Sequence, residues 1–278
     1  MKIISSTKNI IFFLCFLAGC ILFSCSSSTT TPVVTPPADT TAIAGVIGSN
    51  GIAAWDKLAD TERNKLMTWN TLFIHQSVGQ DLEDGCDFNG FPMDYFARGG
   101  SIVKGLYGGL FRASNGSPIE KFAEFKEYAL ANKSNLKVVC FKFGYADIEE
   151  STRTSVQDGY KAMVDELKAN GLRVLHVTPP LVYDVAYNAP KMAVRSWMLT
   201  TFKNDIIFDL QDIESKGLSS GVRCEESSVW RICDDIRSTA ACPSKGQGVD
   251  TPAQGHLCEI AARTISKSFL YSLYMAGK

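Results

Sequence analysis

Apolar and polar positions along the chain follow two periods, one typical of strands and one typical of helices. Short apolar runs predict strands at residues 71–75, 136–143, 173–178 and 206–210. Apolar residues spaced by three and four predict helices at about 53–69, 118–131, 154–169, 190–203 and 257–274. Strands separated by helices favour the α/β class, as a three-layer α/β/α sandwich with a mainly parallel central sheet of the flavodoxin-like kind.

Two long segments, 84–117 and 214–250, interrupt this order and are rich in Gly, Ser and Cys. Long loops in an α/β domain commonly carry the site, and open parallel sheets bind ligands beyond the carboxyl ends of their strands. The residues that follow the predicted strands are therefore the first candidates. They are 75–77, 144–147, 178–180 and 211–212.

The N-terminus has the pattern of an export signal. Lys2 and Lys8 precede an apolar run from residue 10 to residue 23, which is short for a membrane span. The stretches that end at Cys20 and Cys25 resemble the bacterial lipoprotein signal, in which the cysteine receives the lipid. We favour Cys25, because polar residues follow it whereas apolar ones follow Cys20. A plain signal peptide and an uncleaved membrane anchor are the alternatives.

The rest of the chain divides into a tether and one domain. Residues 26–45 are rich in Ser, Thr and Pro and predict a semi-extended linker, and residues 46–278 have the size of a single α/β domain. We expect an exported protein, held by its N-terminal lipid to the bacterial cell envelope, periplasmic or at the cell surface. The 28 Lys and Arg against 29 Asp and Glu give no electrostatic case for nucleic acid.

Beyond the signal, six cysteines remain. Cys140 lies in an apolar run and is expected to be buried, whereas the other five lie in segments where an exported protein forms disulfides, although the sequence does not give the pairing. Cys224, Cys233 and Cys242 lack the C-x-x-C spacing of zinc sites, and the acidic segment 81–90 lacks the register of a calcium loop. We therefore expect no metal.

The three histidines limit the choice of a general base for a nucleophilic serine. Ser77 follows the first predicted strand, where a turn or helix-capping serine is the competing interpretation. His75 is too close to Ser77 to act on it easily, and His176 lies within an apolar strand. His256 lies in a polar turn that leads into the last helix, which would place its imidazole at the carboxyl edge of the sheet.

At these residues the chain resembles the SGNH or GDSL hydrolases, a family of serine esterases and acyl hydrolases. L-F-I-H-Q-S-V-G resembles their first block, with Ser77 as the nucleophile, and the turn and helix at His256 resemble their last block, D-x-x-H. The resemblance implies that His256 is the base and that an acid orients it. Ala253 stands where that acid is expected, so Asp250, six residues before the histidine, is the candidate.

The family's oxyanion donors are only partly present. Residues 144–147 read G-Y-A-D instead of G-x-N-D, so Ala146 replaces an asparagine donor, and one donor is typically worth about 2.7–4 kcal/mol in the transition state. Residues 114–118, S-N-G-S-P, resemble the second block. The resemblance therefore implies an oxyanion site made of the Ser77 amide, Gly116 and Asn115.

These residues together predict an esterase or acyl hydrolase that needs no cofactor and acts on a small-molecule or glycan ester, such as an acylated glycan. A non-catalytic surface binding lipoprotein that keeps the SGNH fold is the alternative, favoured by Ala146 and the displaced acid. A third possibility is an unrelated α/β lipoprotein in which Ser77 and His256 never meet.

Overall fold

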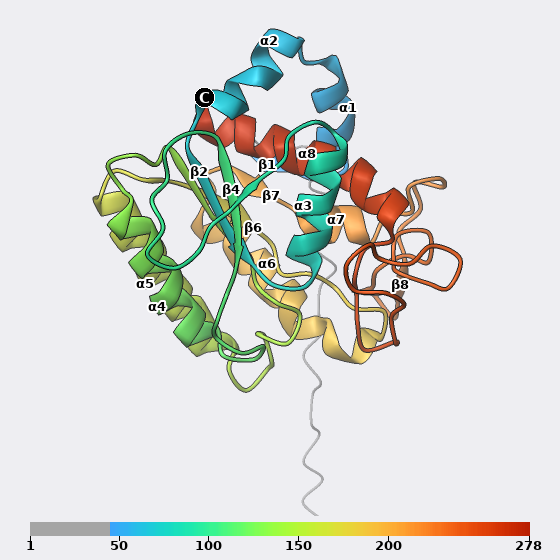
Figure 1. Ribbon diagram of the computed structural model, residues 1–278. Coiled ribbons are helices and arrows are strands. Elements are labelled where there is room, and N and C mark those ends of the chain that lie inside the picture. Colours follow the sequence, from blue (N-terminus) through green and yellow to red (C-terminus); the bar gives the residue numbers. More distant parts are fainter. Residues whose placement is uncertain (1–44) are drawn as a thin grey trace, which may run out of the picture. The chain divides into compact units, whose positions relative to one another are not determined.

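Seven parallel strands form the central sheet of the computed structural model, which describes residues 45–278 (Figure 1). In spatial order the strands are β1 (Val46–Ile47), β7 (Ile207–Phe208), β6 (Arg173–Val177), β5 (Val138–Phe141), β2 (Thr71–His75), β4 (Leu106–Leu110) and β3 (Asp94–Tyr95). All six pairings in this sheet are parallel. The carboxyl ends of the strands therefore share one edge, as an α/β fold requires.

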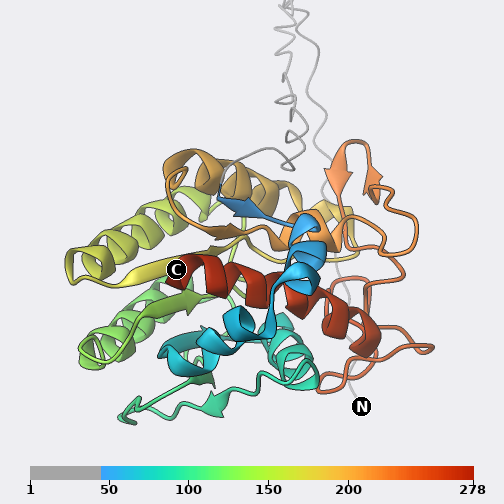
Figure 2. The same cartoon turned by 90° about the horizontal axis from the view of Figure 1, so that it is seen from above.

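Helices cover both faces of the sheet, which confirms the predicted three-layer α/β/α architecture (Figure 2). One layer contains α1 (Asn50–Lys57), α3 (Val78–Phe88) and α8 (Glu259–Gly277). The other contains α4 (Pro118–Ala131), α5 (Arg153–Ala169) and α6 (Ala189–Thr201). The shorter helices are α2 (Asp60–Arg63), η2 (Asn64–Thr68), η3 (Val185–Tyr187) and α7 (Leu210–Glu214).

Alternation along the strands assigns side chains to two cores. On β2, Phe73 packs in the core under α8, whereas Leu72 and Ile74 pack in the core under α4 and α5. On β5, Cys140 is opposite Phe73 and faces the same core, while Phe141 faces the other one. Both faces of these strands are buried, which is why they read in the sequence as continuous apolar runs.

Two predicted regions differ from the structure. The predicted helix at 53–69 is wrong as one element, because the chain forms α1, α2 and η2 in succession there. The segment 84–117, predicted to interrupt the fold, contributes β3 and β4 to the sheet. Strand β4 reads Leu-Tyr-Gly-Gly-Leu, and a side chain at Gly108 would lie within 1.5 Å of the Glu83 carboxylate. Because the glycines that permit this close approach have no hydrophobic side chain, the sequence of β4 lacks the apolar pattern of a strand.

The segment between α7 and α8 is irregular and carries both disulfides found among the described residues. They join Cys224 to Cys233 and Cys242 to Cys258, while Cys86 and Cys140 are free and buried. Its one regular feature is an antiparallel hairpin of β8 (Glu225–Glu226) and β9 (Val229–Trp230). Four of the five cysteines expected in disulfide-forming segments are thus paired, but the expectation is wrong for Cys86, which lies buried and free in α3. Cys140 is a core residue as predicted.

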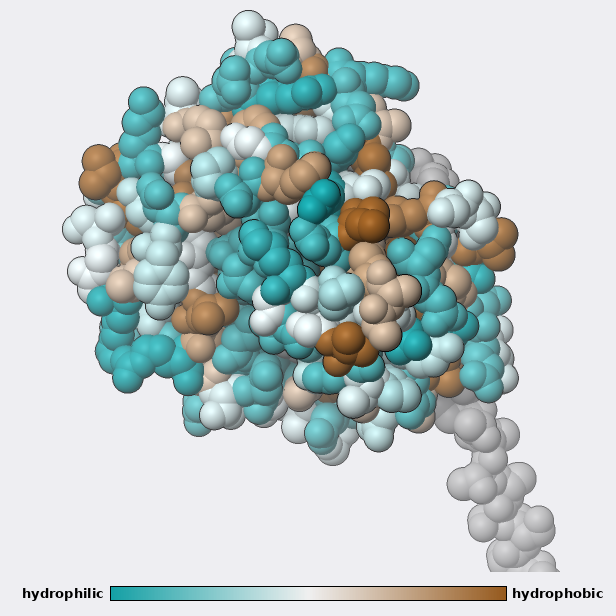
Figure 3. All heavy atoms as spheres, turned by 45° about the vertical axis from the view of Figure 1, so that its right-hand side comes forward, coloured by the Kyte–Doolittle hydropathy of each residue, from teal (hydrophilic) through white to brown (hydrophobic). Residues whose placement is uncertain are grey.

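Figure 3 shows one face of the protein, where hydrophobic residues form separate spots among hydrophilic ones. The large exposed hydrophobic residues include Phe88, Tyr187 and Ile260. Within residues 45–278, none of the helices combines the length and apolar character needed to cross a bilayer. The predicted signal peptide, the predicted linker up to residue 44, and both lipidation candidates, Cys20 and Cys25, lie outside the described residues.

Candidate active site

Ser77 lies at the sharp junction between β2 and α3, beyond the carboxyl end of an interior strand. Its backbone has φ 58° and ψ −119°, a conformation that costs a non-glycine residue about 1–3 kcal/mol and is typical of functional sites. A Cβ at Gly79 would lie 2.3 Å from His75 Cβ, so only glycine lets the first turn of α3 fold back onto the strand. A strained serine on a tight strand-to-helix turn is how hydrolases expose a nucleophile.

Ser77 and His256 meet, although 179 residues separate them in the chain. Ser77 Oγ lies 2.6 Å from His256 Nε2. On the other side of the ring, His256 Nδ1 lies 2.6 Å from Asp250 Oδ1, and the His256 backbone N–H donates to Asp250 Oδ2 at 2.6 Å. The Asp250 side chain is 1% exposed and that of His256 is 5% exposed. The three residues therefore form a Ser–His–Asp arrangement with little access for water.

Asp250 reaches the histidine because the intervening chain turns back on itself. The Gln254 N–H donates to the Thr251 carbonyl, and the Gln254 side chain accepts from the Thr251 N–H. The loop after β6 holds this turn, since the Asp184 N–H donates to the Pro252 carbonyl. This compact turn lets the carboxylate of Asp250, six residues before the histidine, reach His256 Nδ1.

The contacts of His256 indicate which of its ring nitrogens carries the proton. Because a carboxylate faces Nδ1, that nitrogen carries the proton, and Nε2 accepts the hydrogen bond from the Ser77 hydroxyl. A histidine in this tautomer is set to take the serine proton as a general base. The competing interpretation of Ser77 as a capping residue finds no support, because its side chain makes no capping bond to α3.

The segments predicted to supply oxyanion donors lie together, but one donor is occupied. The Gly116 N–H donates to Asp147 Oδ1 at 2.9 Å, so it is not available to a substrate oxygen here. Within residues 45–278, the Ser77 N–H and the Asn115 side-chain amide group have no acceptor. Asn115 lies against Gly144, where an added Cβ would be 2.8 Å from Asn115 Oδ1. Ala146 leaves no side-chain donor at its position.

Gln76 and Asp147 hold these loops in place. Gln76 Nε2 donates to the carbonyls of Phe111 and Ala113, which connects the residue before the nucleophile to the segment that leads to Asn115. Asp147 accepts hydrogen bonds from Lys121 Nζ and from the Gly144 N–H as well as from Gly116. Burial lowers the pKa of Lys121, and the Asp147 carboxylate opposes that effect. The Asp of G-Y-A-D is therefore structural.

The other strand-end candidates do not join the site. The Thr178 hydroxyl donates to Asp209, and Gln211 Nε2 donates to the Pro179 carbonyl. All four residues are buried. Asp212 accepts from Ser49 and pairs with Arg223. These contacts join the residues to each other or to Ser49 and Arg223, and none is with Ser77 or His256.

A pocket of about 520 Å³ lies beside the histidine. The Tyr145 ring contacts the His256 ring edge-on at 5.8 Å, and Ala253 comes from the turn between Asp250 and His256. Most of its wall is apolar or aromatic and includes Ile148, Val182, Ala186, Tyr187 and Pro190. The charged groups of the wall are Glu149, Glu150 and the buried Lys191, whose pKa burial lowers to about 8.

Sequence reasoning missed Asp81, which is 1% exposed and one turn beyond Ser77. It accepts hydrogen bonds from Ser244 Oγ and from the Leu257 N–H. The signal was present in the sequence, because Asp81 lies on the face of α3 that also carries Val78 and Leu82. A carboxylate on an apolar face needs a buried partner.

No known protein family matches this sequence, and no curated protein matches it either. The fold and the contacts therefore define the class to which the chain belongs: a parallel α/β protein with a Ser–His–Asp arrangement at the carboxyl edge of its sheet. The part of the chain that the structure describes contains no cluster of three or more His, Cys, Asp and Glu side chains suited to a metal ion.

Proposed function

We propose that this protein is a serine esterase or acyl hydrolase of the SGNH type. The observation that carries the proposal is the continuous chain of contacts from Ser77 Oγ through His256 to Asp250, each 2.6 Å long. A hydroxyl becomes a nucleophile when a base receives its proton and a third group orients that base. Buried surroundings strengthen both hydrogen bonds.

In the proposed reaction, Ser77 Oγ attacks the ester carbonyl while its proton passes to His256 Nε2. The carbonyl oxygen becomes an oxyanion, which the Ser77 N–H and the Asn115 amide group would stabilise. The carbon–oxygen bond to the alcohol then breaks, and His256 returns the proton to the departing alcohol. Water, deprotonated by the same imidazole, releases the acid from Ser77. Asp250 keeps Nδ1 protonated throughout.

The substrate proposal is an ester with an apolar or aromatic part next to the bond that is cut. The pocket beside His256 supports this, because its walls are mainly apolar and Tyr145 reaches the catalytic ring. An acylated glycan fits the proposed location, in which Cys25 anchors an exported protein to the cell envelope through a lipid. No step of this reaction calls for a cofactor.

The test compares the purified protein with Ser77→Ala and His256→Ala on p-nitrophenyl acetate and butyrate. We expect both variants to lose at least about three orders of magnitude in kcat/KM. Ser227→Ala is the matched control, because Ser227 also has a positive φ but is exposed in the β8–β9 turn. A fluorophosphonate should label wild-type Ser77, identified by mass spectrometry of the peptide, and should leave Ser77→Ala unlabelled.

A non-catalytic binding protein is the second candidate, and two observations favour it. The Gly116 N–H is already donated to Asp147, and Ala146 offers no side-chain donor. With fewer oxyanion donors, a Ser–His contact would hold a ligand without cleaving it. Absence of both hydrolysis and fluorophosphonate labelling in a folded wild-type protein would select this function and make ligand screening the next step.

A further inference from the structure

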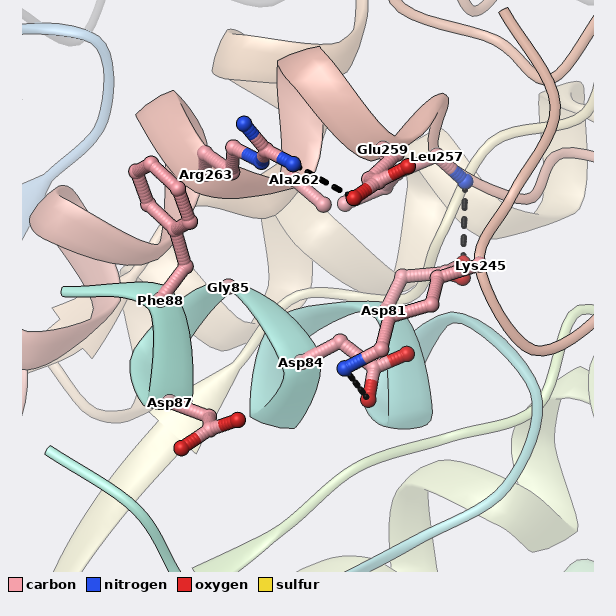
Figure 4. Close-up of a pocket in the computed structure, with 10 residues that line it drawn as sticks. All are labelled: Asp81, Asp84, Gly85, Asp87, Phe88, Lys245, Leu257, Glu259, Ala262 and Arg263. Atoms are coloured by element: carbon pink, nitrogen blue, oxygen red, sulfur yellow. Dashed lines mark hydrogen bonds and ion pairs between the residues drawn. The ribbon is translucent and has the colours of Figure 1, made fainter. Parts of the chain in front are cut away.

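A second buried carboxylate, that of Asp81, binds the backbone next to His256. The Asp250 carboxylate accepts the His256 N–H, and Asp81 Oδ2 accepts the next amide, that of Leu257, at 2.9 Å. Figure 4 shows this bond between α3 and the segment that precedes α8. Two consecutive amides are thus each held by a carboxylate, one from the loop and one from the helix of the nucleophile.

Asp81 also binds the far side of the same loop. Its Oδ1 accepts from Ser244 Oγ at 2.5 Å, and Ser244 Oγ in turn accepts from the Gln247 N–H. The Cys242–Cys258 disulfide closes the loop next to these contacts. Helix α3, which follows Ser77 directly, is therefore held at Asp81 to both ends of the segment that carries Asp250 and His256.

We propose that Asp81 is a positioning residue for the reaction: it fixes His256 in register with Ser77, and its charge favours the protonated imidazole that forms when the serine attacks. The proposal rests on the proposed function and adds to it a residue that compensates for the longer acid-to-histidine spacing. In a loop with three extra residues, Asp250 travels with the histidine and cannot by itself set the distance to Ser77. Asp81 lies on α3, which follows Ser77 directly, and can therefore set the distance between His256 and Ser77.

The electrostatic surroundings agree with this role. Burial raises the pKa of Asp81 to about 6, while its bonds to Ser244 and Leu257 and the charges of His256 and Lys142 act in the opposite direction. At neutral pH Asp81 is therefore ionised near the imidazole. The charged groups around the small pocket that it lines are Asp84, Asp87, Lys245, Glu259 and Arg263 (Figure 4).

The test measures the rate at which a fluorophosphonate labels Ser77 as a function of pH, which needs no knowledge of the natural substrate. Asp81→Asn keeps a side chain that can bind Leu257 N–H and Ser244 but removes the charge. We expect the acid limb of its pH–rate profile to shift to lower pH by roughly half a unit. At a given pH on that limb, this shift changes the rate about threefold. Asp81→Ala removes both contacts, and we expect a loss of about 10–100-fold at every pH.

Asp87→Asn is the matched control. Asp87 is exposed on the same helix, and its side chain forms no bond with the other residues drawn in Figure 4, so its profile should match the wild type. If Asp81→Ala fails to fold, Ser244→Ala tests the same connection and should lower the rate. An acid limb unmoved in Asp81→Asn, or a wild-type rate in Asp81→Ala, overturns the proposal. A folded wild type that is not labelled at Ser77 refutes the serine mechanism itself.

Discussion

Lys121 Nζ and the Asp147 carboxylate form an ion pair at 2.6 Å, and neither side chain is exposed. The Asp147 carboxylate also accepts hydrogen bonds from the N–H groups of Gly116 and Gly144, so the ion pair is connected to two loops of the candidate site. Moving two charges out of water is costly unless each finds its partner and further hydrogen bonds. Here a single carboxylate meets both conditions and fixes two loops.

Removing the acid should therefore destabilise the protein strongly. We expect Asp147→Ala to lower the free energy of unfolding by about 3–5 kcal/mol, since it leaves the Lys121 ammonium buried without a counter-charge. Adding Lys121→Met should restore part of that loss. Urea denaturation gives the values, with Lys126→Met as the control, because its ion pair with Glu166 is exposed and worth about 1 kcal/mol or less. A loss for Asp147→Ala as small as the control's would contradict this account.

The two disulfides should differ in their effect on activity. Cys258 is two residues after His256, and its bond to Cys242 closes the loop that contains Asp250, whereas Cys224–Cys233 closes a loop that contains none of the candidate site residues. We expect Cys242→Ser with Cys258→Ser to cost about 3 kcal/mol and to lower Ser77 labelling at least tenfold. The pair Cys224→Ser with Cys233→Ser should lose stability but keep labelling within about threefold. Equal labelling in both double variants would rule out a role for the first bond in the site.

The fold and the central pair of the site could be predicted from the sequence, because both depend on local patterns. The helix at 118–131 and the strand at 71–75 have the predicted limits, and Ser77 and His256 stand at junctions that the patterns mark. Strand β4 was missed because Gly108 and Gly109 carry no hydrophobic side chain. The contacts of Gly116 with Asp147 and of Leu257 with Asp81 join segments far apart in the chain, which no local pattern records.

Gly79→Ala sets two effects against each other. In a helix, alanine is favoured over glycine by about 1 kcal/mol, but here the new Cβ would lie 2.3 Å from His75 Cβ and Cγ, and His75 is fully buried. The clash should prevail, with a net loss of about 1–3 kcal/mol and slower labelling of the adjacent Ser77. Gly159→Ala is the milder comparison, because its Cβ would meet the exposed Ile119 and the buried Phe122 ring at 3.1 Å, contacts that a small shift relieves. Thermal unfolding should show a smaller loss there than in Gly79→Ala, and a stabilised Gly79→Ala would refute the packing argument.

Asp81 should also give stability a dependence on pH. Because burial raises its pKa from 3.8 to about 6, the folded protein holds this proton more strongly than the unfolded chain does. The stability it contributes is complete below pH 4 and is lost as pH rises through 6, an effect of about 3 kcal/mol at about 1.4 kcal/mol per pH unit. Asp81→Asn cannot ionise, so its free energy of unfolding relative to wild type should increase by up to about that amount between pH 4 and pH 7. Urea denaturation at both pH values measures the difference, and a constant difference would show that the carboxyl titrates alike in the folded and unfolded protein.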